Sequence, residues 1–162
     1  MSTTPSNISS PSRFEERVLT EGYGPGAWHG PDLKAALADV EREVAFWRPG
    51  QGRHNIAEIA LHHAYCVRSV RGHLSRQPPD PFIVAGEDWF ELNGDGPLSW
   101  DAVRSVIEHE QQQLAGLVAG IASGEIDSRI TDSERFDRVL GITCHAVYHA
   151  GQVQLIKRLA AE

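Results

Sequence analysis

The sequence predicts an all-α protein folded as a four-helix bundle. Four segments carry apolar residues at the spacing of an amphipathic helix, residues typical of helix boundaries flank them, and little of the chain alternates as a strand does. The chain has 162 residues, 41% of them hydrophobic, so it can bury a core as one domain of ordinary size. Four predicted helices of this length, with no predicted strand, are typical of a four-helix bundle.

The N-terminal part is expected to differ from the rest. Residues 1–12 are polar, contain two prolines and have too few apolar side chains to pack. We therefore predict a flexible tail over 1–12 and a folded domain over 13–162. A short helix is expected to start within 13–20, and the glycine-rich segment 21–26 is expected to form a loop.

The first long helix is predicted over residues 32–47. Pro31 and Asp32 provide a start signal, and Pro49 with the following glycine stops the helix. Its buried stripe is expected at Leu33, Leu37, Val40, Val44 and Trp47.

The second helix is predicted over residues 56–75, and a long loop follows it. Asn55 at the N-cap and Glu58 three residues later resemble a capping box. Residues 77–98 contain four prolines, three glycines and several large aromatic side chains. Because a loop of this length is usually functional or flexible, we expect its aromatic residues to pack over one end of the bundle.

The third and fourth helices are predicted over residues 100–122 and 133–160. Ser99 caps the third helix and Gly124 ends it. The fourth has no proline, and its apolar residues lie at positions 136, 139, 140, 147, 155, 156 and 159.

Charge and composition exclude several classes of function. The 15 basic and 22 acidic residues give a formal charge of -7, which disfavours nucleic acid and anionic lipid as partners. No apolar run approaches the roughly 20 residues of a membrane span, and the first dozen residues lack a signal-like segment. We expect a cytoplasmic protein. Its two cysteines, Cys66 and Cys144, are expected to be free thiols, with Cys144 a small core residue.

Three histidines predict a metal site. His145 and His149 lie four residues apart, so on a helix they project from one face. On the second helix, His62 lies on the apolar stripe and the adjacent His63 towards its margin, so we choose His62 as the third ligand. Three imidazoles suit a divalent ion, zinc or nickel first, with iron and manganese also compatible. The alternative is that these histidines are core residues with ordinary hydrogen-bond partners.

The order of several motifs resembles that of the DinB-like (DinB/YfiT) superfamily over about residues 13–160. The motifs are Trp28-His-Gly-Pro31, Trp47-Arg-Pro, His54-Asn-Ile-Ala-Glu-Ile-Ala-Leu-His62, Asp88-Trp89 and His145-Ala-Val-Tyr-His149-Ala-Gly-Gln152. The resemblance implies an up-up-down-down four-helix bundle, commonly dimeric. It also implies a divalent metal held by His62, His145 and His149.

The resemblance leaves three functions open. One is a transferase that joins a low-molecular-weight thiol to electrophilic small molecules, since a bound cation favours the thiolate. Another is a hydrolase that uses metal-activated water. A third is a non-catalytic, dimeric metal-binding module. The motif HAVYH lacks the glutamate of zinc proteases, which favours thiol chemistry; Glu58 or Glu110 could act as a base, but each is expected to be a surface charge.

Other residues near the motifs have alternative roles. Cys66, four residues after His62, would close a structural site, although the resemblance does not imply a cysteine ligand. Gln152 either orients a ligand or substrate or packs beside Gly151, whose missing side chain would admit a neighbouring helix. His29 and His54 either line the pocket or are capping or surface residues. Trp89 and Phe90 either roof the pocket or cover the end of the bundle.

Overall fold

The computed structural model describes residues 11–162, and side chains from residue 14 onward. Within this range the chain is helical and has no strand, which confirms the all-α prediction. The predicted tail over 1–12 lies outside the described residues, except for residues 11 and 12, which begin the first helix. The helices are α1 (Pro11–Tyr23), α2 (Leu33–Ala38), α3 (Arg42–Phe46), α4 (Ile56–Ser75), α5 (Trp100–Ser123) and α6 (Asp132–Ala160).

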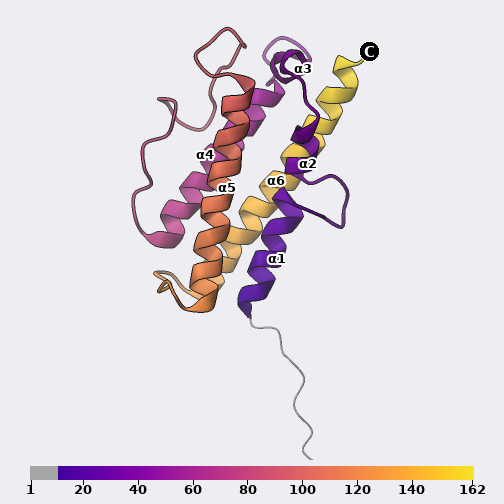
Figure 1. The fold of residues 1–162 in the computed structure, drawn as a ribbon. Helices are drawn as coiled ribbons and strands as arrows, with labels where there is room; N and C mark the ends of the chain where they lie inside the picture. Colours follow the sequence, from indigo (N-terminus) through magenta and orange to yellow (C-terminus); the bar gives the residue numbers. More distant parts are fainter. Residues whose placement is uncertain (1–10) are drawn as a thin grey trace, which may run out of the picture.

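The four longer helices lie side by side. α4 packs against α5 and α6, and α1 packs against α5 and α6 on their other side. In Figure 1, α1 and α6 run upward while α4 and α5 run downward. The order along the chain is therefore up, down, down, up, which differs from the expected up-up-down-down order. The physical reason is the long connection between α4 and α5, which returns the chain to the upper end before α5 begins.

The single helix predicted over 32–47 is wrong. The structure has two short helices there, α2 and α3, and α1 takes the place of the fourth long helix. The break falls at Val40, which is buried and whose carbonyl oxygen accepts a hydrogen bond of 2.7 Å from the indole N–H of Trp100. This contact with α5 holds the chain at Val40 between the two short helices, so tertiary packing overrides the apolar periodicity.

The predicted helix boundaries elsewhere agree with the structure. Asn55 caps α4 by accepting a hydrogen bond from the Glu58 N–H, and the Glu58 carboxylate accepts one in return, a complete capping box. Thr131 and Glu134 form a second capping box at the start of α6, and Ser99 caps α5. Gly124 ends α5 with a positive φ of 77°, a conformation that favours glycine.

The long loop after α4 runs back along this helix, from Arg68 in its C-terminal half to the N-cap Asn55, whereas the sequence analysis expected it to pack over one end of the bundle. The ring centroid of Tyr65 on α4 lies 5.4 Å from that of Phe82 and 5.6 Å from that of Phe90, both in the loop. Phe90 is buried in the main core with residues of α2, α4 and α5. The loop therefore has a fixed aromatic anchor next to α4, which also fixes its neighbours Asp88 and Trp89.

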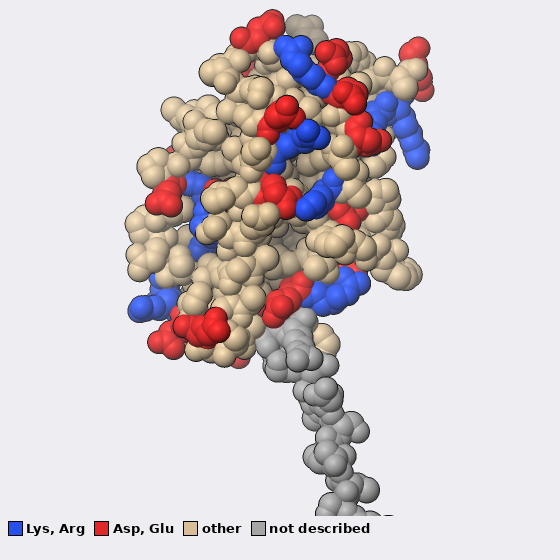
Figure 2. All heavy atoms as spheres, viewed as in Figure 1, with Lys and Arg blue, Asp and Glu red and all other residues tan. Residues whose placement is uncertain are grey.

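The surface carries charges of both signs. Figure 2 shows acidic and basic side chains interspersed over the face that Figure 1 presents, with apolar and neutral residues between them. None of the described helices combines the length and the apolar character that crossing a lipid bilayer requires.

Candidate metal centre

Three imidazoles from α4 and α6 converge between these helices. The Nε2 atom of His145 lies 3.1 Å from Nε2 of His62 and 3.1 Å from Nε2 of His149. Two ligands of a tetrahedral zinc ion, each bonded at about 2.0 to 2.1 Å, lie about 3.3 Å apart. The structure thus places the Nε2 atoms of His62 and His149 each at a distance from His145 that suits two ligands of one ion.

The far nitrogens of two of these rings are bound by oxygen acceptors. Nδ1 of His62 lies 2.9 Å from the backbone oxygen of Asp88 and 3.1 Å from its carboxylate, and Nδ1 of His149 lies 2.6 Å from Oε1 of Gln152. Each Nδ1 therefore donates a proton, and a neutral ring keeps only a lone pair on Nε2. Lone pairs that face one another in a partly buried space repel, and a cation between them removes that repulsion. The donor set fits a divalent metal, and the outer contacts match those usual for metal-binding histidines.

The third ring is supported by His63. Its Nδ1 lies 2.8 Å from Nδ1 of His145, and its Nε2 lies 2.8 Å from the amide nitrogen of Gln111 on α5. His63 is fully buried. The sequence analysis placed this residue at the margin of the stripe and gave it no role. The adjacent pair of histidines was the signal: positions about 100° apart on α4 contact His145 from two sides.

Burial keeps the rings of His145 and His149 unprotonated. It lowers the pKa of His145 to about 4, and the nearby His149 and His62 act in the same direction. Burial also lowers the pKa of His149 to about 4, although its hydrogen bond to Gln152 acts in the opposite sense. Both rings are therefore neutral near pH 7, the form that binds a metal ion.

The sequence left open whether Trp89 and Phe90 cover the site or pack in the bundle, and the structure gives them different positions. The indole of Trp89 lies between His54 and His62, with ring centroids 3.7 Å and 3.9 Å away and nearly parallel planes. It covers one side of a proposed ligand, whereas Phe90 belongs to the core. A cavity of about 380 Å³ opens beside Trp89 and His54, and Arg53 and Glu91 also line it.

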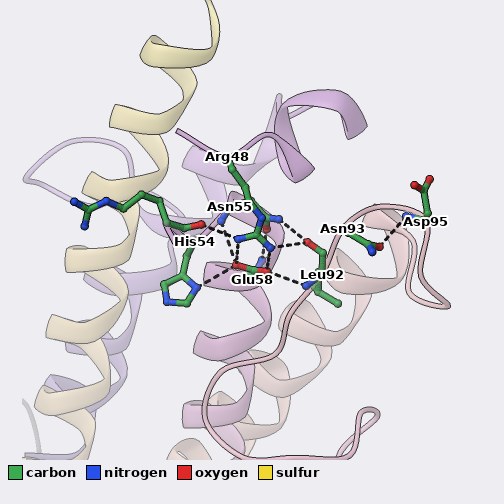
Figure 3. Close-up of polar contacts among 8 residues, drawn as sticks. Arg48, His54, Asn55, Glu58, Leu92, Asn93 and Asp95 are labelled. Carbon is green, nitrogen blue, oxygen red and sulfur yellow. Dashed lines mark hydrogen bonds and ion pairs between the residues drawn. The ribbon is translucent and has the colours of Figure 1, made fainter. Parts of the chain in front are cut away.

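Glu58 is not the surface charge that the sequence predicted. Its side chain is 1% exposed and lies in the network of Figure 3, where Arg48, the Leu92 N–H (2.9 Å) and Nδ1 of His54 (3.1 Å) surround the carboxylate. Burial raises the pKa of this carboxyl, but these contacts lower it more, so the pKa lies below its usual value. Through its hydrogen bond with the Leu92 N–H, Glu58 links α4 to the loop instead of facing the metal site.

Glu110 is likewise buried, not a surface charge. Its Oε2 accepts hydrogen bonds of 3.0 and 2.7 Å from the guanidinium of Arg71. Both carboxylates that the sequence offered as general bases are therefore held in ion pairs.

Cys66 lies near the histidines. Its Sγ is 3.9 Å from Nε2 of His62, and His62, Cys66 and His145 form a group that could hold a metal ion. Burial, with the nearby Asp88 carboxylate, raises the pKa of this thiol to about 11. Without a cation the thiol is protonated near pH 7, so Cys66 is not a free thiolate nucleophile.

The model of a protein family matches the part of the chain that contains these histidines. The model of the DinB superfamily matches residues 27–153, a range that contains α2 to α5, the long loop and the part of α6 with both histidines. The chain belongs to the DinB superfamily. No curated protein and no solved structure matches it significantly. In this DinB protein α1 precedes the matched range, although it packs against α5 and α6.

The predictions for four further residues of this DinB protein have different outcomes. Cys144 is exposed, so its prediction as a core residue is wrong. Gly151 is also exposed, and an added Cβ would meet no atom within 4 Å, so it admits no neighbouring helix of the same chain. Gln152 contacts His149, which agrees with an orienting role. His29 is exposed in its loop, where Nε2 contacts the backbone oxygen of Glu21.

Proposed function

We propose that this protein is a metal-dependent enzyme in which His62, His145 and His149 hold a divalent cation. The observation that supports this most directly is the convergence of three Nε2 atoms, two of which have their Nδ1 protons committed to oxygen acceptors. Zinc and nickel are the first expectations, and iron and manganese are also compatible with imidazole ligands.

The reaction that we favour is transfer of a low-molecular-weight thiol to an electrophilic small molecule. A divalent cation at this site would lower the pKa of a thiol brought to it and so raise the share of thiolate. Hydrolysis benefits from a free carboxylate as general base, but Glu58 and Glu110 are bound by arginines. Asp88 contacts Nδ1 of His62 and so supports the ligand from behind.

The protein's own groups would shape the substrate site. Trp89 covers one face of His62, and the cavity lined by Trp89, His54 and Arg53 could receive a small molecule. Nucleic acid is not proposed as a substrate, because the formal charge is -7 and charges of both signs are interspersed on the face in Figure 2.

The principal test is elemental analysis of untagged protein purified without added metal. The variants His145→Ala and His149→Ala should lose a metal that the wild type binds at about one ion per chain. His109→Ala, which removes an exposed imidazole from α5, should keep it. If the wild type holds no metal even after incubation with zinc, nickel or manganese, the enzyme proposal fails.

Cys66 favours a second candidate, a non-catalytic module with a closed metal site. Removal of the thiol by Cys66→Ala separates the two functions. Under the enzyme proposal the variant keeps its metal with little change in affinity, and the loaded protein consumes a thiol in the presence of an electrophile. A loss of about one metal per chain in Cys66→Ala would instead support the closed site.

A third candidate is a hydrolase, which would use the same cation. It can be distinguished from the transferase because only the transferase needs a thiol. Loaded protein should be assayed with an ester in the absence of thiol and with an electrophile in its presence. Turnover of the ester alone would favour hydrolysis, whereas consumption of the thiol in step with the electrophile would favour transfer.

A further inference from the structure

A chain of hydrogen bonds runs from α5 through α4 to a proposed metal ligand on α6. The amide nitrogen of Gln111 lies 2.8 Å from Nε2 of His63, and Nδ1 of His63 lies 2.8 Å from Nδ1 of His145. His63 is fully buried, so its two ring nitrogens depend on these partners. The direction of each hydrogen bond therefore fixes the direction of the next.

The Gln111 amide sets the direction of the whole chain. An amide nitrogen only donates, so Nε2 of His63 accepts and carries no proton. The proton of a neutral His63 ring is then on Nδ1, and this N–H donates to Nδ1 of His145. The proton of His145 is left on Nε2, where it can donate to Nε2 of His62 or of His149, each 3.1 Å away. In this arrangement each donor meets an acceptor.

The same arrangement cannot bind a cation through His145. A metal ion needs a lone pair on Nε2, and here that atom carries a hydrogen. In the reversed chain Nδ1 of His145 donates to Nδ1 of His63, and Nε2 of His63 donates to the side-chain oxygen of Gln111. Nε2 of His145 then has the lone pair. Both rings stay neutral, because each proton only changes place between the two nitrogens of its own ring.

The surroundings of Gln111 allow its amide to turn. The side chain is only partly buried and lines a cavity of about 450 Å³ between α1 and α5. An amide that turns its oxygen to His63 moves its NH₂ group away from that ring. The open space beside it lets water accept those hydrogens, so the reversed chain leaves no donor of Gln111 without a partner.

We propose that Gln111 is a positioning residue for the metal centre. Through His63 its amide selects which nitrogen of His145 carries the proton, and it presents its oxygen instead of its nitrogen when a cation binds. The inference rests on the proposed function, because it concerns the same metal site. It adds a residue of α5 to a centre whose proposed ligands come from α4 and α6.

Nuclear magnetic resonance of ¹⁵N-labelled protein tests the reversal directly, because two-bond correlations show which ring nitrogen carries the proton. Spectra are recorded after treatment with a chelator and after addition of zinc, and the variant His63→Phe identifies the signals of His63. We expect the His63 proton on Nδ1 without zinc and on Nε2 with zinc. If the wild type binds zinc and His63 keeps one tautomer throughout, the inference is overturned and the proposed function stands.

Variants with only one kind of hydrogen-bonding group test whether Gln111 acts through His63. Glutamate only accepts and lysine only donates, so Gln111→Glu should bind zinc about tenfold more tightly than the wild type and Gln111→Lys about tenfold more weakly. Competition with a chelator measures the affinities, and circular dichroism checks the fold. Gln113→Glu and Gln113→Lys add the same charges at an exposed position of α5 and should leave the affinity unchanged.

The same substitutions in a His63→Phe background separate hydrogen bonding from charge. Both effects should disappear there, because the chain from Gln111 to His145 is interrupted. Effects of undiminished size would show that charge alone causes them and would refute the inference. A wild type that binds no zinc would refute the proposed function as well, so the affinity of the wild type distinguishes the two failures.

Discussion

His63 is the single residue whose role changed most between sequence and structure. The sequence places it beside a proposed ligand, but a helical projection does not show what lies behind His145. The fold fills that space with His63 and joins it to Gln111 on a third helix. Outer contacts of this kind fix the ring orientation of a ligand, and they depend on packing between helices that are distant in sequence.

We predict that His63→Phe weakens metal binding by about 10- to 100-fold without unfolding the protein. Phenylalanine fills the space but forms no hydrogen bond, so His145 loses the contact that orients its ring. Competition with a chromogenic chelator measures the affinity. His73→Phe, an exposed position on the same helix, should leave the affinity unchanged. Equal affinity in His63→Phe and wild type would show that His63 only fills space.

Glu58 is expected to contribute strongly to stability. We predict that Glu58→Gln lowers the free energy of unfolding by about 3 kcal/mol, because Arg48 loses its ion pair inside a largely buried network. Urea unfolding measures the change. Glu43→Gln, at an exposed position, should change stability by less than about 0.5 kcal/mol. A similar effect of both substitutions would contradict the role of the network in Figure 3.

The same carboxylate predicts a pH dependence. Its pKa is lower in the folded protein than in the unfolded chain. The unfolded chain then binds the proton first, so the stabilisation from Glu58 is complete above the unfolded pKa of about 4.3 and is lost as pH falls through the lower folded value. Unfolding free energy measured between pH 6 and pH 3 should decrease less in Glu58→Gln than in the wild type. Parallel curves would contradict this.

Among the helices, those with strong local signals were predicted best. The starts of α4, α5 and α6 follow from capping residues whose hydrogen bonds are local, and their apolar spacing agrees with the structure. The segment 32–47 has a helical pattern too, yet it divides at Val40, where the backbone contacts Trp100 of α5. The length of α1 was underestimated, since the segment has few apolar residues and its stability comes from packing on α5 and α6.

Two glycines inside helices should respond alike to alanine. Gly116 on α5 and Gly151 on α6 are both exposed and have open space where a Cβ would lie. Gly116→Ala and Gly151→Ala should each raise the free energy of unfolding by roughly 0.5 to 1 kcal/mol, because alanine favours a helix more than glycine does. Urea unfolding measures the change. A loss of stability in either variant would show that a Cβ meets a neighbour at that position.

At the level of the complete domain, metal binding should couple α4 to α6. A ligand that binds only the folded protein stabilises it by about 2.7 kcal/mol at a hundredfold excess over its Kd. For a domain of this size we predict a rise in Tm of about 5 to 10 °C on addition of zinc, reversed by a chelator. His149→Ala should show no such rise, whereas His109→Ala should behave as the wild type does. A rise of equal size in His149→Ala would place the zinc elsewhere.

The sequence alone determined the all-α class, most helix boundaries, the membership of the DinB superfamily and the choice of His62, His145 and His149 for the metal site. These depend on local hydrogen bonding, on helical periodicity and on motifs with fixed spacing, all of which involve residues close together in the sequence. The membership is confirmed by the family model, and the metal assignment stays a prediction.

Only the tertiary structure decided which groups surround those histidines and which apolar residues stay outside. Packing of α4 on α6 brings the imidazoles together, and the returning loop sets Asp88 and Trp89 against His62. The same packing buries Glu58 and Glu110 in ion pairs and leaves large apolar residues of α6, such as Tyr148 and Leu155, exposed. Periodicity identifies apolar residues on a helix but not the neighbour that covers them, because that depends on contacts between segments far apart in the chain.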